Sequence, residues 1–132
     1  MAERRLLLVD DHTFFRTALR RLLDLQPDLK VCGEAPDLAS AAEMAAQLEP
    51  DLILLDVSLG DADGLELLPH LRRAGLKKTP VVVLSMHEDA DHVERAHAAG
   101  ATAYVSKSRD ASQLLAVVRD ALAGRSGGNH AG

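Results

Sequence analysis

The chain has 132 residues, 47% of them hydrophobic and 27% charged, a composition that excludes a disordered or fibrous protein and fits one globular domain. Its formal net charge of -5, with no block of basic residues, argues against nonspecific binding to nucleic acid or to an anionic membrane through this domain. A single cysteine, Cys32, excludes a disulfide framework, and no signal-peptide core follows Met1, so we expect a soluble, cytoplasmic protein.

Five short apolar runs alternate with segments of helical period. In chain order, the pattern predicts a strand at 5–9, a helix at 13–25, a strand at 29–33, a helix at 38–48, a strand at 52–55, a helix at 64–73, a strand at 81–84, a helix from near Asp89 to Gly100, a strand at 101–106 and a helix at 111–123. Asp37 is the expected N-cap of the second helix. The alternation predicts an α/β, doubly wound (βα)5 domain over 4–124, followed by a flexible tail or linker stub over 125–132.

The apolar runs also predict the order of the strands in the sheet. The runs at 6–9, 52–55 and 81–84 are continuously apolar, as in strands that are covered on both faces. The runs at 29–33 and 101–106 are more mixed and are placed at the edges. The predicted order is therefore 2-1-3-4-5, for a parallel sheet that binds ligands beyond the carboxyl ends of its strands.

Polar side chains follow four of the predicted strands. They are Asp10 and Asp11 after the first strand, Asp56 after the third, Ser85 after the fourth and Lys107 after the fifth. Each pair of carboxylates about 4 Å apart costs on the order of 4 kcal/mol at an effective dielectric constant of about 20, so a cation is required to offset the repulsion. Carboxylate oxygens with room for water suit Mg²⁺.

The chain resembles the receiver domains of two-component response regulators over residues 5–123. Asp10 and Asp11 are similar to the acidic pair of that family, and Asp56 is similar to its phosphoryl acceptor. Ser85 and Lys107 match its switch hydroxyl and its lysine. The resemblance extends to the loop 56–64, which ends in the same Asp-Gly pair.

The resemblance implies a flavodoxin-like sandwich and a phosphorelay function. A sensor histidine kinase would supply the phosphoryl group to Asp56, with Mg²⁺ held by Asp10, Asp11, Asp56 and the backbone carbonyl of Ser58. Phosphorylation would draw Ser85 inward and admit the ring of Tyr104, the family's switch aromatic, which changes the face formed by the fourth helix, fifth strand and fifth helix. Such a domain is a phosphoacceptor that catalyses only its own phosphorylation and dephosphorylation, and it is not otherwise an enzyme.

The segment 11–16 and the pair Lys107-Ser108 look most like the NarL/FixJ branch, whose members carry a LuxR-type helix-turn-helix. The output implied is transcription control through a DNA-binding domain outside this chain, with a possible homodimer through the fourth-helix face or through the first and fifth helices. The Gly-Gly tail favours an excised receiver over a complete single-domain regulator. Gly60 and Ser108 stand where the family often has proline, which should loosen the loop after Asp56 and removes the usual signal for a cis peptide.

Three other classes were compared with these motifs. A haloacid-dehalogenase-type phosphatase requires a second acid two residues after its aspartate, where this chain has Ser58. A dinucleotide-binding enzyme requires a glycine-rich turn where this chain has Asp10-Asp11-His12. The alternative that stays open is a receiver-like module that binds partners without phosphorylation.

The two phenylalanines and a group of histidines need separate interpretation. Phe15 fits the buried stripe of the first helix, whereas Phe14 is expected at its flank, either partly buried or docking a kinase. Spacings of five residues make solvated side chains the favoured interpretation of His87, His92 and His97 over a metal site. By the family comparison, Ser58 and His87 occupy positions that shape the access of water to the phosphoryl group.

Overall fold

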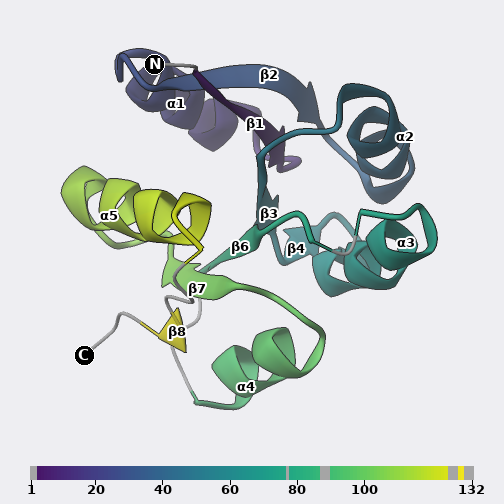
Figure 1. The fold of residues 1–132 in the computed structure, drawn as a ribbon. Coiled ribbons are helices and arrows are strands. Elements are labelled where there is room, and N and C mark those ends of the chain that lie inside the picture. Colours follow the sequence, from purple (N-terminus) through teal and green to yellow (C-terminus); the bar gives the residue numbers. More distant parts are fainter. Residues whose placement is uncertain (1–2, 77, 87–89, 125–127, 130–132) are drawn as a thin grey trace.

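The protein folds into one parallel sheet between two layers of helices (Figure 1). This computed structural model describes residues 3–76, 78–86, 90–124 and 128–129. The strands of the main sheet are β1 (Arg4–Val9), β2 (Leu29–Ala35), β3 (Leu52–Asp56), β6 (Val81–Ser85), β7 (Ala103–Ser106) and β8 (Gly128–Asn129). Their order is β2-β1-β3-β6-β7-β8, and the five predicted strands lie within it in the order 2-1-3-4-5, which confirms the predicted fold.

The helices are α1 (Thr13–Asp24), α2 (Leu38–Leu48), α3 (Leu67–Arg73), α4 (Ala90–Ala98) and α5 (Ala111–Leu122). Asp37 caps α2 as predicted, because its side chain accepts a hydrogen bond from the backbone N–H of Ser40 at 2.8 Å. Among the described residues, no helix has the length and apolar content needed to cross a membrane.

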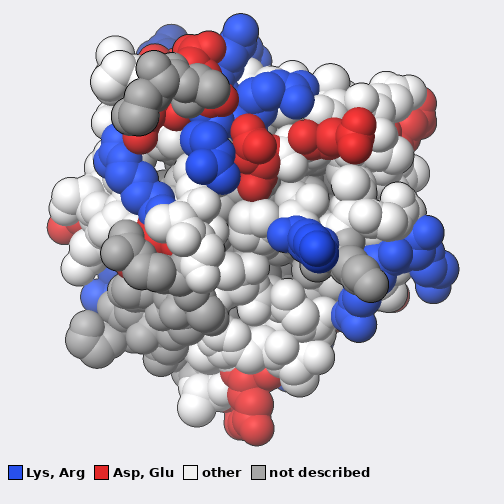
Figure 2. Space-filling view, viewed as in Figure 1, with Lys and Arg blue, Asp and Glu red and all other residues white. Residues whose placement is uncertain are grey.

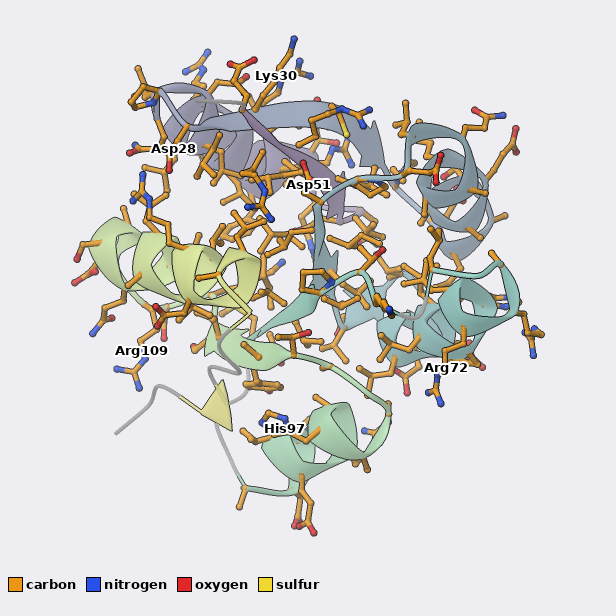
Figure 3. All side chains as sticks on the ribbon, viewed as in Figure 1. Asp28, Lys30, Asp51, Arg72, His97 and Arg109 are labelled. Atoms are coloured by element: carbon orange, nitrogen blue, oxygen red, sulfur yellow. The ribbon has the colours of Figure 1, made fainter. Side chains whose placement is uncertain are left out.

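Two hydrophobic cores lie on opposite faces of the sheet because side chains alternate along each strand. Leu7 and Val9 pack toward α2, α3 and α4, while Leu6 and Leu8 pack toward α1 and α5. Side chains fill both spaces between sheet and helices, whereas Lys30 projects outward (Figure 3). Burial on both faces explains the continuous apolar runs of the central strands.

The predicted helix at 64–73 is divided in the structure. Residues Gly64–Glu66 form a 3-10 turn, η1, and the α-helix begins at Leu67. Asp63 caps η1 by accepting a hydrogen bond from Leu65 N at 3.0 Å. The division places Pro69 in the first turn of α3, where its missing N–H needs no helical partner.

The prediction that 101–106 forms an edge strand needs correction. β7 lies between β6 and β8, and Ala103 and Tyr104 pair with Gly128 and Asn129. A domain boundary at residue 124, with a flexible tail after it, stays a prediction.

The loop after β3 carries a second, separate pairing. β4 (Ser58–Leu59) and β5 (Ala62–Asp63) form a two-stranded antiparallel hairpin, with Gly60 in its turn. The φ of Gly60 is 59°, a left-handed conformation that proline cannot adopt. A hairpin of this kind places the start of the loop, next to Asp56, close to its end at Gly64.

Candidate functional site

Two buried aspartates and a lysine meet at the carboxyl edge of the sheet. Val9 of β1 is in register with Leu55 of β3, so Asp10 and Asp56 leave neighbouring strands at the same level. Lys107 follows β7, and its Nζ lies 3.0 Å from Asp10 Oδ2 and 2.9 Å from Asp56 Oδ2. All three side chains are buried, with exposed fractions of 2%, 3% and 6%. The structure therefore joins three of the residues that the sequence placed at strand ends.

Asp11 reaches the same place from the turn after β1. Its Oδ2 accepts a hydrogen bond of 2.7 Å from the backbone N–H of Gly60. Proline at position 60 would lack that donor. Gly60 thus fastens the loop after Asp56 to the acidic turn, a contact that the sequence comparison did not anticipate. Oδ1 of Asp11 is buried, and no described residue donates a hydrogen bond to it.

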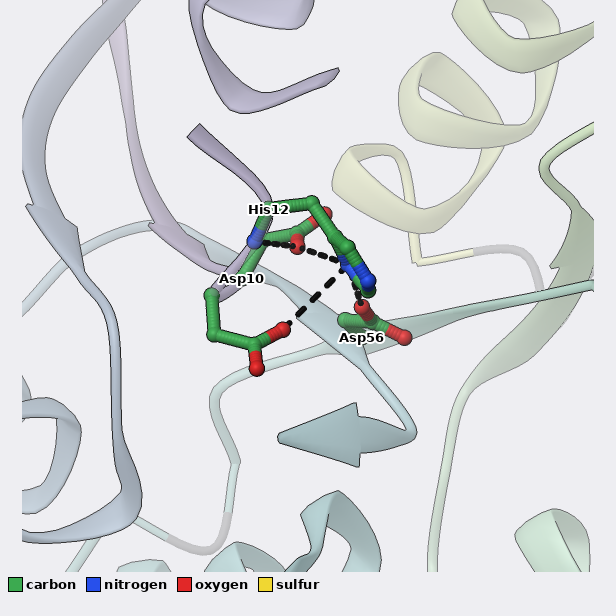
Figure 4. A group of neighbouring side chains, drawn as sticks. Asp10, His12 and Asp56 are labelled. Carbon is green, nitrogen blue, oxygen red and sulfur yellow. Dashed lines mark hydrogen bonds and ion pairs between the residues drawn. The ribbon is translucent and has the colours of Figure 1, made fainter. Parts of the chain in front are cut away.

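His12 completes the cluster, although the sequence analysis did not select it. Its Nδ1 lies 3.0 Å from Asp10 Oδ1 and 3.2 Å from Asp56 Oδ2, in hydrogen-bonding geometry (Figure 4). The same nitrogen is 3.2 Å from Asp11 Oδ1. The hydrogen bond with Asp10 raises the pKa of His12 above 6.5, against a smaller opposing effect of the Lys107 charge. The position of His12 directly after Asp10 and Asp11 was the feature of the sequence that could have placed it in the site.

The carboxyl group of Asp56 is buried and has a raised pKa. Burial raises its pKa above the ordinary value of 3.8, and Asp10 acts in the same direction. Lys107 and the backbone N–H of Ser58, 3.0 Å from Asp56 Oδ1, oppose this effect. A carboxylate with little access to water and a nearby ammonium is suited to act as a nucleophile in a site that already holds positive charge.

The backbone around Asp56 leaves space only for glycine at position 64. A Cβ on Gly64 would lie 2.2 Å from the carbonyl oxygen of Asp56. The N–H of Gly64 also donates to the carbonyl of Val57 at 2.6 Å. The Asp-Gly pair that ends the loop therefore packs directly against the backbone of Asp56.

Ser85 and Tyr104 lie on the two strands next in order. Ser85 ends β6 and is fully buried, and its carbonyl accepts a hydrogen bond of 2.7 Å from the N–H of Lys107. Tyr104 lies in β7 and is 3% exposed, within the core that faces α2, α3 and α4. The peptide bond between Lys107 and Ser108 is trans, in agreement with the absence of proline at position 108.

The three carboxylates of the cluster fit a hard divalent cation. One ligand atom each from Asp10, Asp11, His12 and Asp56 lies within 4.8 Å of all the others. The buried Oδ1 of Asp11 accepts no hydrogen bond from the described residues and lies 3.2 Å from His12 Nδ1, so this oxygen has bonding capacity left for a cation. Carboxylate oxygens of this kind suit Mg²⁺. The role of the Ser58 carbonyl as a further ligand stays a prediction.

Of the phenylalanines and histidines considered from the sequence, Phe15 alone among the described residues contacts the acidic cluster, through Lys107. Phe14 is 90% exposed, so the expectation of partial burial was wrong, and its kinase-docking role stays a prediction. Phe15 packs in the buried stripe as predicted, and Lys107 Nζ lies 4.4 Å above the centre of its ring. His97 is exposed and His92 is half-buried, whereas His87 lies outside the described residues.

Known proteins are similar to this chain in sequence and in fold. Residues 6–119 match the family model of the response regulator receiver domain. Among curated proteins, the nitrate/nitrite response regulator NarL of Escherichia coli K12 is 38% identical over 119 residues, covering 90% of this chain and 55% of that protein. The transcriptional regulatory protein LiaR of Bacillus subtilis is 36% identical over 120 residues, covering 91% of this chain and 56% of LiaR.

The solved receiver domain of a putative response regulator NarL from Mycobacterium tuberculosis has the same architecture. It superposes with a TM-score of 0.88 at 31% identity, covering 95% of this chain and 100% of that one. The chain spans about half the length of the curated relatives that it matches, since 55% and 56% of those proteins are covered. The chain belongs to the family of response regulator receiver domains, and its similarity to NarL and LiaR places it in the NarL/LuxR branch.

Proposed function

We propose that the protein receives a phosphoryl group on Asp56 from a sensor histidine kinase and that Mg²⁺ assists the transfer. The observation that carries the proposal is the contact of Lys107 with two buried carboxylates, at 3.0 Å from Asp10 and 2.9 Å from Asp56. A purely structural ion pair would not explain why Asp11 also has a buried oxygen that accepts no hydrogen bond from the described residues, or why a glycine packs against the backbone of Asp56. Phosphoryl transfer requires alignment and stabilisation of charge, which these residues supply.

In the transfer step, a carboxylate oxygen of Asp56 attacks the phosphorus atom of a phosphohistidine. A P–O bond forms as the P–N bond breaks, and the leaving imidazole keeps the electron pair and takes up a proton. Asp11, Asp56 and the Ser58 carbonyl would hold Mg²⁺, with Asp10 through water, and the ion would supply positive charge for the phosphoryl oxygens. Lys107 pairs with another phosphoryl oxygen through its ammonium.

The modification adds about two negative charges beside Lys107 and the buried hydroxyl of Ser85. Charge-assisted hydrogen bonds to the new oxygens would draw both groups inward. Movement of Ser85 would open space for Tyr104, which lies one strand away in the core facing α4. The face formed by α4, β7 and α5 would then change, as a two-state switch.

The output proposed is control of transcription. NarL and LiaR are named as a response regulator and a transcriptional regulatory protein, and this chain spans about half of each. A DNA-binding domain outside this chain would contact DNA, without direct nucleic-acid contact by the receiver itself. Lys and Arg lie among Asp and Glu on the face shown in Figure 2. A homodimer through α4–β7–α5 or through α1 and α5, in the cytoplasm, would pair two such output domains.

Incubation with acetyl phosphate and Mg²⁺, followed by intact-mass measurement, tests the proposal. We expect one phosphoryl adduct, absent without Mg²⁺ and absent in Asp56→Ala. Release of inorganic phosphate without an adduct would instead indicate a phosphatase. If no donor modifies the folded protein, including a histidine kinase, the chain is a receiver-like interaction module that works without phosphorylation.

A further inference from the structure

Arg16, in the second turn of α1, is bonded to the acidic turn on both sides of Asp11. Its guanidinium donates from Nη1 to the backbone carbonyl of Asp10. Its backbone N–H donates to the carbonyl of His12 at 2.9 Å. The Arg16 side chain therefore holds the peptide on the Asp10 side of Asp11, whereas the bond to His12 is the ordinary i to i−4 bond of the helix backbone.

Glu34 of β2 fixes the guanidinium in this position. Glu34 Oε1 accepts from Nε of Arg16 at 3.0 Å, and its Oε2 accepts from Nη1 of Arg20. Arg16 and Glu34 are mostly buried, with side chains 16% and 24% exposed, whereas Arg20 is 48% exposed. Arg20 also lies 3.4 Å from Asp24. Of these two arginines, Arg16 bonds the acidic turn, while Arg20 bonds the outer side of Glu34.

The orientation of the Asp11 carboxylate is only partly fixed by hydrogen bonds. Its Oδ2 is held by the N–H of Gly60, but its buried Oδ1 receives no hydrogen bond from the described residues. Besides the Gly60 bond and the His12 ring, whose Nδ1 lies 3.2 Å from Oδ1, the direction of Oδ1 depends on the backbone conformation of Asp11. Fixing the peptide groups on either side restricts that backbone, and residues that orient ligands in this way commonly determine metal affinity.

We propose that Arg16 is a positioning residue that holds the turn Asp10–His12 so that Asp11 presents Oδ1 to the divalent cation. The inference rests on the proposed function, because it assumes that the cation binds at this cluster. Glu34 contributes by keeping the guanidinium fork aligned between β2 and the carbonyl of Asp10.

Charge alone predicts the opposite result. Loss of a positive charge near a cation site should strengthen cation binding, and loss of Arg16 or of Arg20 removes the same charge from the same network. Loss of positioning should weaken cation binding, and only for Arg16. Arg16→Met and Arg20→Met are therefore a matched pair. Both lose one positive charge, which should strengthen Mg²⁺ binding, but only Arg16→Met loses the positioning contact, which should weaken it.

The test measures Mg²⁺ affinity by NMR titration of the full chain, at a temperature where each variant is folded. We expect Arg16→Met to weaken Mg²⁺ binding about tenfold, Arg20→Met to change it less than about twofold, and Arg16→Lys to fall between wild type and Arg16→Met. In an Asp11→Asn background, Arg16→Met should cause no further loss, because its effect passes through Asp11.

A second measurement, made without Mg²⁺, tests the positioning of Asp11 directly. The amide proton of Gly60, which donates to Asp11 Oδ2, should shift in metal-free Arg16→Met and stay in place in Arg20→Met. Equal Mg²⁺ affinities for the two methionine variants, or an undiminished effect of Arg16→Met beside Asp11→Asn, would overturn the inference. If wild type binds no Mg²⁺, the proposed function fails, and the Gly60 resonance alone decides whether Arg16 positions Asp11. Should Arg16→Met not fold, Arg16→Lys is compared with Arg20→Lys, since both keep the charge: weaker Mg²⁺ binding in Arg16→Lys alone supports positioning, and equal affinities overturn it.

Discussion

Lys107 Nζ lies 2.9 Å from Oδ2 of Asp56, although 51 positions separate the two residues in the chain. The same ammonium lies 3.0 Å from Asp10, so one cation serves two buried anions. Burial makes this contact strong, because water does not screen it, and makes removal of the shared lysine costly.

Loss of Lys107 should therefore destabilise the fold. Lys107→Met would leave two buried carboxylates without their cation, and we expect the free energy of unfolding to fall by about 3 kcal/mol. Urea denaturation at neutral pH without Mg²⁺ measures the change. In an Asp56→Asn background the cost should be smaller, since one of the two charges is already gone. An equal cost in both backgrounds would show that the loss comes from packing.

Neutralising Asp56 should have the opposite effect. Its pKa is raised in the folded protein, mainly by burial, so folding disfavours the charged form. Asp56→Asn should therefore be more stable than wild type above the raised pKa. The gain should disappear as the pH falls below the ordinary value of 3.8, where the carboxyl is protonated in both folded and unfolded chains. Thermal unfolding from pH 3 to pH 8 in EDTA provides the measurement, and a gain that persists at the lowest pH would contradict this account.

His12 should titrate above its ordinary value of 6.5, chiefly because of its hydrogen bond with Asp10. Asp10→Asn removes that acceptor charge, so the pKa of His12 should fall. The stabilisation of the fold by the imidazolium is fully present below pH 6.5 and is lost as the pH rises through the higher pKa of the folded protein. The effect on stability is small because the ring is 60% exposed. NMR of the His12 ring protons measures the titration in both proteins. An unchanged midpoint in Asp10→Asn would exclude the hydrogen bond as the cause.

Gly64→Ala should damage the site through the backbone. The added methyl group would stand 2.2 Å from the carbonyl oxygen of Asp56, so the loop or β3 has to move. We expect a loss of about 2 kcal/mol in unfolding free energy and slower phosphorylation. Gly33→Ala is the control, because its methyl group meets the flexible end of Leu48 at 2.9 Å and costs less. Equal losses in the two variants would reject the close approach as the cause.

Phe14 is 90% exposed at the start of α1, and its role in docking a kinase is a prediction. Phe14→Ala should leave stability within about 0.5 kcal/mol of wild type. Transfer from the cognate kinase should slow about fivefold, equivalent to about 1 kcal/mol of docking energy. Labelling by acetyl phosphate, which uses no docking surface, should keep its rate. Equal slowing with both donors would reject the docking role.

Local sequence determined the elements themselves. The apolar runs predicted all five strands of the βα repeat, and Asp37 predicted the cap of α2, because side-chain period and capping chemistry act within a few residues. The helical period runs through 64–73 without a break, so it does not show the split of the third helix, which depends on the N–H that Pro69 lacks. The β7–β8 pairing was missed because pairing between strands depends on a neighbour and leaves no mark in a two-residue segment.

The sequence by itself also determined the identities of Asp10, Asp11, Asp56, Ser85 and Lys107, since each follows a recognisable strand and parallel strands end at one edge. Only the tertiary structure decided how the ends are joined: which carboxylates share Lys107, that Gly60 holds Asp11, and that His12 and Arg16 belong to the site. Strand register sets the level at which side chains emerge, but hydrogen bonds act over about 3 Å. Contacts over that range depend on side-chain rotamers and loop paths, which distant parts of the chain fix together.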